Sequence, residues 1–102
     1  MTHAIELHLR ARVAPGKRAD FLAFLREAVP FYESPGGIRV RVLFDREDPD
    51  RFVEVIEYAT VDIQDRDQQR VEHDPEMRSF LERWRALLDG PVTVERYDLV
   101  VP

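Results

Sequence analysis

The sequence contains no cysteine, and this absence excludes several classes of site at once. Disulfide scaffolds, thiol nucleophiles and cysteine-based metal centres all require that residue. Long apolar runs are also missing, and none approaches the ~20 residues that a membrane-spanning helix needs. The N-terminal segment "MTHAIELHLRARV" carries charges throughout, unlike a secretory signal peptide. We therefore expect a cytoplasmic protein that has no membrane partner.

Positive charge is in short supply as well. The 15 Lys and Arg residues are outnumbered by 20 Asp and Glu residues, and the net charge is −5. The basic residues are scattered, whereas a nucleic-acid-binding surface needs a concentrated cationic footprint, so nucleic acid is not an expected partner. With 44% apolar and 34% charged residues, the 102-residue chain has a globular composition. We expect a single domain over residues 1–102.

Alternation of apolar and polar residues predicts four β-strands. In the first, Ile5, Leu7 and Leu9 alternate with charged residues, a period of two that gives one apolar face. Three further segments complete the set, at 38–44, 51–59 and 92–101. The polar segment "DREDPD" separates the second strand from the third by a short distance, so these two strands are expected to form a hairpin.

Two segments have helical spacing of apolar residues. The first begins at Arg18 and is expected to stop or kink at Pro30. The second runs from Met77 to Leu88, and Asp89-Gly90-Pro91 closes it. Residues 61–73 are polar and weakly periodic, which fits a short helix or an irregular lead-in. The order β-α-β-β-α-β predicts an α+β, ferredoxin-like antiparallel sheet with two helices on one face.

One face of this predicted sheet has no helix to cover it. It presents mixed charges, among them His8, Arg10 and Arg39, with acids such as Glu54 or Glu57 from the third strand. The face is either solvated in a monomer or stacked on the same face of a second copy. Large apolar residues occur on both sides of the third and fourth strands, which favours a homodimer through the sheet face.

The segment Glu72-His73-Asp74 is a candidate for a metal site or for a catalytic base. Adjacent residues of a helix point apart and cannot easily close on one ion, so no metal site is expected. His73 is a candidate general base, because its reference pKa of about 6.5 suits proton transfer near neutral pH. Alternatively, His73 is an exposed residue that only precedes a helix. Asp74 is a good N-cap and Pro75 fits the first helical position.

Several other residues are candidates for a pocket or for packing alone. Trp84 lies on the apolar stripe of the last helix, as core or as pocket lining. The hydroxyl of Tyr58 or Tyr97 could orient a carbonyl or phenol, or could simply belong to the core or an interface. The first helix is unusually aromatic, with Phe21, Phe24, Phe31 and Tyr32, which suits the wall of a pocket for a flat ligand as well as it suits a core.

The chain resembles a known family in several short motifs. It has "PGK" after the first strand, "PGG" before the second, "DPEMRSFL" in the last helix and "GPVTVERYDLV" near its end. These motifs resemble the antibiotic biosynthesis monooxygenase domain of the dimeric α+β barrel superfamily, over nearly the whole chain. The resemblance implies a homodimer whose two sheets face each other, and a pocket between each sheet and its own helices.

The family covers several activities, and the resemblance alone does not choose among them. Members include cofactor-free oxygenases of polyketide quinols, haem-degrading enzymes and isomerases of small signalling molecules. Haem-degrading members have Asn, Trp and His about where Arg10, Val71 and Leu81 stand here, so haem is not expected. Many oxygenase-like members have histidines near the positions of Val71 and Glu76, which this chain lacks.

The resemblance therefore implies two functions in different classes. The first is a cofactor-independent monooxygenase or isomerase that acts on a small aromatic or enolisable molecule. His73 or Tyr58 would be its base, Arg10 the cation that holds the substrate anion, and no cofactor or metal would be needed. The alternative is a non-catalytic dimeric module of the same fold that binds a small molecule or a partner.

Overall fold

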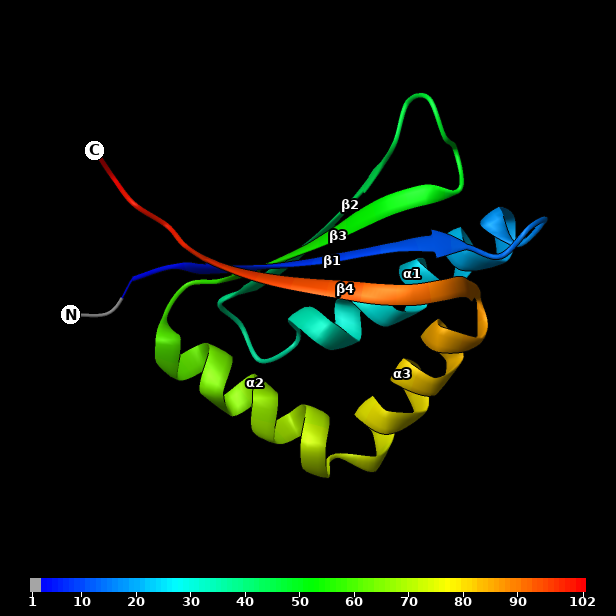
Figure 1. Ribbon diagram of the computed structural model, residues 1–102. Helices are drawn as coiled ribbons and strands as arrows, with labels where there is room; N and C mark the ends of the chain where they lie inside the picture. Colours follow the sequence, from blue (N-terminus) through cyan, green and yellow to red (C-terminus); the bar gives the residue numbers. More distant parts are fainter. Residues whose placement is uncertain (1–2) are drawn as a thin grey trace.

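The computed structural model describes residues 3–102 and has the element order βαββααβ (Figure 1). The strands are β1 (Ile5–Val13), β2 (Ile38–Phe44), β3 (Arg51–Tyr58) and β4 (Leu88–Asp98). The helices are α1 (Arg18–Glu33), α2 (Val61–His73) and α3 (Pro75–Ala86). The predicted ferredoxin-like α+β fold is confirmed. The first two residues of the predicted 1–102 domain lie outside the described range.

The four strands form one antiparallel sheet in the order β2-β3-β1-β4. On β1, Leu9 pairs with Glu54 of β3 on one side and with Val94 of β4 on the other. Side chains of directly paired residues point to the same face of a sheet. Figure 1 shows all three helices on one side of the sheet, and these three side chains point toward that side.

The densest part of the core lies beneath α1. Phe21 is fully buried, and its ring centroid lies 4.8 Å from that of Phe52 on β3. Phe44 of β2 meets the same Phe21 ring edge-on at 6.2 Å. This aromatic group fills the space between α1 and one end of the sheet, so the remaining sheet surface is left to α2 and α3.

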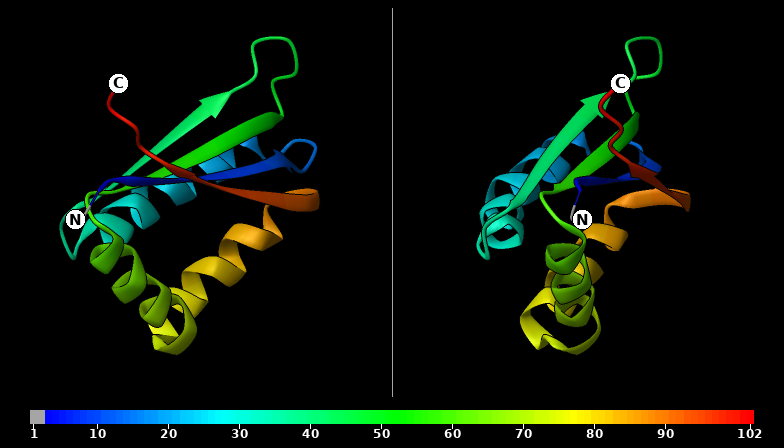
Figure 2. Two further views of the ribbon diagram at one scale, coloured as in Figure 1. Left: turned by 60° about the vertical axis from the view of Figure 1, so that its left-hand side comes forward. Right: turned by 90° about the vertical axis from the view of Figure 1, so that its left-hand side faces the viewer.

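Residues 61–73 form the regular helix α2. Thr60 caps it, since its hydroxyl oxygen accepts the backbone N–H of Ile63 at 3.2 Å. Asp74 then separates α2 from α3 with an extended backbone, and its carboxylate accepts the N–H of Glu76 at 2.9 Å. The predicted helix start at Asp74-Pro75 is confirmed. The two helices diverge from each other in a V below the sheet (Figure 2).

Two predicted boundaries are wrong. Helix α1 continues through Pro30 to Glu33, because proline removes only one backbone donor and does so close to the end of the helix. Strand β4 begins at Leu88, inside the segment that was expected to end a helix. Gly90 has a positive φ of 82°, and the register with β1 shifts between Arg10 and Arg12. This bulge-like irregularity lets the chain begin to pair with β1 directly after the end of α3.

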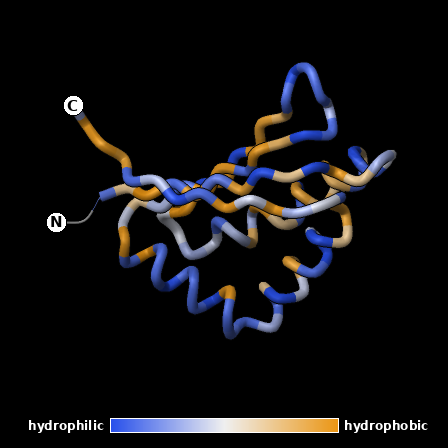
Figure 3. The backbone as a smooth tube through the Cα atoms, viewed as in Figure 1, coloured by the Kyte–Doolittle hydropathy of each residue, from blue (hydrophilic) through white to orange (hydrophobic). Residues whose placement is uncertain are grey.

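The face of the sheet without helices carries charged and aromatic side chains. Arg10 donates from Nε to Glu95 at 2.6 Å, and the His8 ring lies 4.7 Å from that of Tyr97. Figure 3 shows that α2 is largely hydrophilic along its length, as expected for a helix that touches the domain along a narrow stripe. Within residues 3–102, no helix has the length and apolar character needed to cross a membrane.

Candidate functional site

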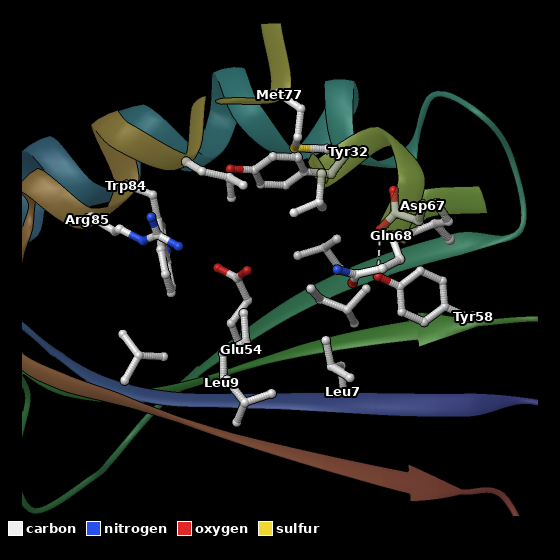
Figure 4. A pocket seen from close by; sticks show the side chains of 17 residues that line it. Leu7, Leu9, Tyr32, Glu54, Tyr58, Asp67, Gln68, Met77, Trp84 and Arg85 are labelled. Atoms are coloured by element: carbon white, nitrogen blue, oxygen red, sulfur yellow. Dashed lines mark hydrogen bonds between the residues drawn. The ribbon is translucent and has the colours of Figure 1, made fainter. Parts of the chain in front are cut away.

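A cavity of about 440 Å³ lies between the sheet and the helices α2 and α3 (Figure 4). Most of its lining is aliphatic: Leu7, Leu9, Ile38, Val40, Ile56, Val71, Leu81, Val92 and Val94, with Met77. Pockets that bind small molecules typically have volumes of roughly 300–1,000 Å³ and a mainly apolar lining. The cavity is therefore large enough for a flat organic molecule.

Three polar atoms around this cavity are buried and lack a hydrogen bond within residues 3–102. They are the Tyr32 hydroxyl oxygen, Glu54 Oε1 and Trp84 Nε1. The three side chains come from α1, β3 and α3, and Figure 4 shows them around the same space. An unpaired buried polar group costs about 1–3 kcal/mol, and folded proteins pair the great majority. Their gathering at one cavity points to a ligand site.

Glu54 is the most unusual of the three. The sequence predicts Glu54 or Glu57 on the uncovered face; Glu57 lies there, but for Glu54 the prediction is wrong. It shares the helix-facing side of β3 with Ile56 and Tyr58, and only 3% of its surface is exposed. Burial raises the pKa of Glu54 to about 7, although the neighbouring Trp84 indole opposes the shift. At neutral pH this group is available both as acid and as carboxylate, as a proton-transfer group should be.

Tyr58 lines the same cavity but is held by a buried network. Its hydroxyl donates to Asp67 Oδ2 at 2.6 Å, and Asp67 Oδ1 lies 3.0 Å from Nη2 of Arg70. Burial raises the pKa of Tyr58 well above its usual value, and Asp67 adds to the shift. A hydroxyl whose proton is already shared with a carboxylate is a poor base. Tyr58 therefore serves as a fixed wall of the cavity.

Arg70 fastens α2 to the rest of the domain. Its guanidinium donates to the backbone carbonyl oxygens of Phe31 at 3.1 Å and Tyr32 at 2.7 Å, at the end of α1. It also pairs with Asp67 on its own helix. The last carbonyls of a helix have no partner inside that helix, so Arg70 supplies a donor to Tyr32 and adds one to Phe31, whose carbonyl also accepts from Ser34. Arg70 thereby fixes the position of α2 over the cavity.

The structure brings two of the sequence candidates, Tyr58 and Trp84, to the cavity. His73 lies outside it at the end of α2, with 71% of its side chain exposed and Glu72 as its neighbour. Arg10 lies on the opposite face of the sheet and is bonded to Glu95. Neither can touch a molecule inside the cavity without a large rearrangement.

The two phenylalanine candidates also lie elsewhere. Phe21 and Phe24 belong to the core beneath α1, and the cavity lining does not include them. The sequence names Tyr32 among the aromatic residues of the first helix that suit a pocket wall, and Tyr32 does line the cavity. It does not single out Asp67, and it misplaces Glu54. A signal for Glu54 was present: residues 52, 54, 56 and 58 of one strand must share a face. In the part of the chain that the structure describes, no three His, Asp or Glu side chains are grouped as metal ligands.

Comparisons with known proteins agree with this architecture. Residues 4–83 match the family model described as antibiotic biosynthesis monooxygenase. No curated protein matches the sequence. A solved structure from Nitrosomonas europaea, which carries the name of the same family, is similar with a TM-score of 0.80 at 19% identity. The alignment covers 100% of this chain and 95% of that one.

Two more solved structures show the same likeness. A protein from Bordetella bronchiseptica, also named for the family, has 25% identity and a TM-score of 0.68, over 97% of this chain and 99% of that one. A conserved protein from Methanosarcina mazei has 18% identity and a TM-score of 0.78, over 93% of this chain and 91% of that one. Since the family model covers most of the sequence, the chain belongs to the antibiotic biosynthesis monooxygenase family.

Proposed function

We propose that this protein is a monooxygenase that oxidises a small aromatic or enolisable molecule in the cavity between the sheet and α2/α3. One observation carries the proposal: an apolar cavity is bordered by three buried polar groups that have no hydrogen-bond partner among residues 3–102. Membership of the family supports the reaction class. The groups at the cavity are a carboxyl, a phenol and an indole, which suit proton transfer and hydrogen bonding to an anion.

The proposed reaction converts a CH₂ group next to an enolisable carbonyl into a second carbonyl. Removal of a proton leaves a substrate anion, which gives its electrons to dioxygen. One oxygen atom becomes the new carbonyl oxygen, and the other leaves with the two hydrogens as water. The substrate itself is the reductant, so the chain needs to supply a base, donors for the anion and a site that excludes water.

Oxygen uptake tests this proposal. A panel of quinols and hydroxylated anthrones is compared with analogues that cannot enolise, using the wild-type protein and Val94→Trp. Val94 lines the cavity on the edge strand β4 and is 56% exposed, so a tryptophan there obstructs the opening without disturbing the core. We expect kcat/KM to fall at least about tenfold, because an obstructed site loses substrate positioning.

The matched control is Val100→Trp, the same change at a position that is 75% exposed and outside the cavity. It should retain wild-type uptake, and so should His73→Ala, whose side chain also lies outside the cavity. Uptake at background level on every member of the panel contradicts the proposal. Equal loss in Val94→Trp and Val100→Trp contradicts the assignment of the cavity.

A binding module without catalysis is the second candidate. Val71, which stands near the position of a histidine in many oxygenase-like members, contributes only an aliphatic surface to the cavity here. The unpartnered polar groups would still bind a ligand. A compound that raises the melting temperature through cavity binding but is never consumed under air would favour this function.

We also propose that the protein is a homodimer through the helix-free face of the sheet. Leu43 and Tyr97 on that face remain 50% and 45% exposed in the single chain. Val53 of β3 lies on the same face, paired with Leu43 on one side and with Arg10 on the other. Exposed apolar groups of this size on an open sheet favour a partner. The charges of the face can pair across a two-fold interface.

Sedimentation at micromolar concentration should give twice the 12.0 kDa mass of the chain. Val53→Lys places a third positive charge beside Arg10 and Arg51 in the proposed interface, and this repulsion is expected to shift the protein toward the monomer. Ala23→Lys, at an exposed position on α1, is the control and should leave the mass unchanged. A wild-type protein that sediments only as a 12.0 kDa species rules out this interface.

A further inference from the structure

We propose that Glu54 and Trp84 form a socket for one hydroxyl group of a neutral phenol or enol, and that Glu54 accepts its proton. The inference deepens the proposed function and rests on it, because it names the substrate class and the base of the same cavity. It assigns a role to a carboxyl that the fold buries without a partner.

The two atoms are complementary. In the described part of the chain, Glu54 Oε1 is a buried acceptor without a donor, and Trp84 Nε1 is a buried donor without an acceptor. Only 3% and 6% of the two residues are exposed. Figure 4 shows Glu54 rising from β3 into the cavity toward the space between Trp84 and Tyr32. The Trp84 N–H is near enough to lower the pKa of the carboxyl as a weak donor, but the two groups do not reach hydrogen-bond geometry with each other, so both remain open to a ligand. The pair thus presents one acceptor and one donor to the same volume.

A hydroxyl group satisfies both atoms at once. Its oxygen accepts the N–H of Trp84, and its hydrogen is donated to Glu54. An ether oxygen could accept but not donate, so it would leave Glu54 unpaired. A carboxylate ligand would bring a second negative charge next to Glu54 in an apolar enclosure, which is strongly unfavourable. The chemistry of the socket therefore selects a neutral phenol or enol.

The proton step follows from this arrangement. The O–H bond of the ligand breaks, the proton forms a new O–H bond on Glu54, and the negative charge stays on the ligand oxygen. Trp84 Nε1 then donates to an oxyanion instead of a neutral oxygen, and such charge-assisted hydrogen bonds are roughly twice as strong. The Tyr32 hydroxyl, also unpartnered, is a second donor at the same cavity. The site stabilises the anion better than the neutral ligand, as catalysis requires.

Four other titratable groups line the cavity, all from α1, β3, α2 and α3, whereas β1, β2 and β4 contribute only aliphatic side chains to it. They are Tyr32 of α1, Tyr58 of β3, Asp67 of α2 and Arg85 of α3. Burial raises the pKa of both tyrosines above its usual value. Asp67 is paired with Arg70 and accepts the proton of Tyr58. A pH dependence of ligand binding centred near neutrality therefore reports on Glu54, whose pKa is about 7.

The test is equilibrium binding of two probes without oxygen: 2-naphthol, and 2-methoxynaphthalene, which lacks the hydroxyl hydrogen. Affinities are measured at about pH 5.5 and about pH 8.5, below and above the pKa of the carboxyl. In the wild type, preference for 2-naphthol over the ether should rise roughly tenfold or more at the higher pH, because a carboxylate accepts a hydrogen bond more strongly than an acid does.

Variants isolate the two halves of the socket. Glu54→Gln should give a preference that does not change with pH, because glutamine does not ionise. Glu82→Gln, the same change at an exposed position of α3, should behave as the wild type. Trp84→Phe should weaken 2-naphthol binding but keep the pH dependence, since only the N–H donor is lost.

If the wild type prefers 2-naphthol over the ether equally at both pH values, that result alone overturns the inference. So does a pH-dependent preference that survives in Glu54→Gln, or the absence of saturable 2-naphthol binding. The proposed function fails separately. Selective 2-naphthol binding without oxygen uptake on any substrate supports the hydroxyl-binding site and contradicts the monooxygenase reaction. Equal oxygen uptake by the wild type and Glu54→Gln supports the reaction and contradicts the role of Glu54 as its base.

Discussion

Glu54→Gln is expected to raise the free energy of unfolding by about 3 kcal/mol at about pH 8, and to change it little at about pH 5. The pKa of Glu54 is raised from 4.5 in its reference state to about 7 in the folded protein. Between these values the folded state keeps a proton that the unfolded chain has lost. The free energy of unfolding of the wild type therefore falls as the pH rises through this window. That of Glu54→Gln does not fall in this way, because glutamine has no proton to lose.

Urea denaturation across this pH window, at fixed protein concentration, measures the effect. An increase of about 3 kcal/mol corresponds to a rise in Tm of more than about 10 °C for a domain of this size. The control is Glu82→Gln, an exposed glutamate of α3, for which a change within about 0.5 kcal/mol is expected. Equal stability of the wild type and Glu54→Gln at every pH would show that Glu54 is not a strained buried acid.

The same result bears on function. A carboxyl that destabilises the folded state near neutral pH is a local conflict between sequence and fold, and such conflicts are expected at functional sites. Replacement by glutamine should give a more stable protein that no longer binds phenols in a pH-dependent way. Stability gained together with binding lost is the pattern expected when a strained group has a chemical role.

Much of the fold could be predicted because it follows from periodicity. The strand at Ile5–Val13 has a clear period of two, and the helix that starts at Pro75 has both a cap and an apolar stripe. Helix α2 was harder to predict, since a largely hydrophilic helix contacts the domain through few residues. Its regularity depends on contacts made by Asp67 and Arg70 with distant parts of the chain, which no local pattern encodes.

The candidate site was predicted less well, for a physical reason. Leu9 lines the cavity and Val13 lies in the solid core, yet both fit one apolar alternation in the sequence. Sequence patterns report which face a residue occupies, but not whether the space opposite is filled. His73 was a candidate base only because histidine titrates near neutral pH, and the structure places it on the surface. Glu54 was misplaced because it was grouped with the charged residues of the uncovered face, against the parity of its own strand.

Arg70→Ala is expected to destabilise the protein by about 3–5 kcal/mol, the range for removing one partner of a buried ion pair. Only 16% of the Arg70 side chain and 9% of the Asp67 side chain are exposed. The variant leaves Asp67 with the Tyr58 hydroxyl but without its cation, and it removes the donors to the carbonyls of Phe31 and Tyr32. The free energy of unfolding in urea measures the loss.

Two comparisons make this result specific. Arg66→Ala removes an exposed arginine from the same helix and should change the free energy of unfolding by less than about 0.5 kcal/mol. Arg70→Lys keeps the charge but loses the planar guanidinium that reaches both carbonyls, so an intermediate loss is expected. An Arg70→Ala loss as small as that of Arg66→Ala would contradict the proposed role.

The effect of Arg70 should extend to the cavity, because the same guanidinium that holds α2 also binds the backbone of Tyr32. In a double variant with Asp67→Asn, the losses should be less than additive, since residues of one network share their energies. If Arg70 fixes α2 over the cavity, Arg70→Ala should also weaken 2-naphthol binding under conditions where the protein remains folded. If the variant is destabilised but binds 2-naphthol as well as the wild type does, Arg70 stabilises the fold without affecting the cavity. The position of α2 would then not be important for binding.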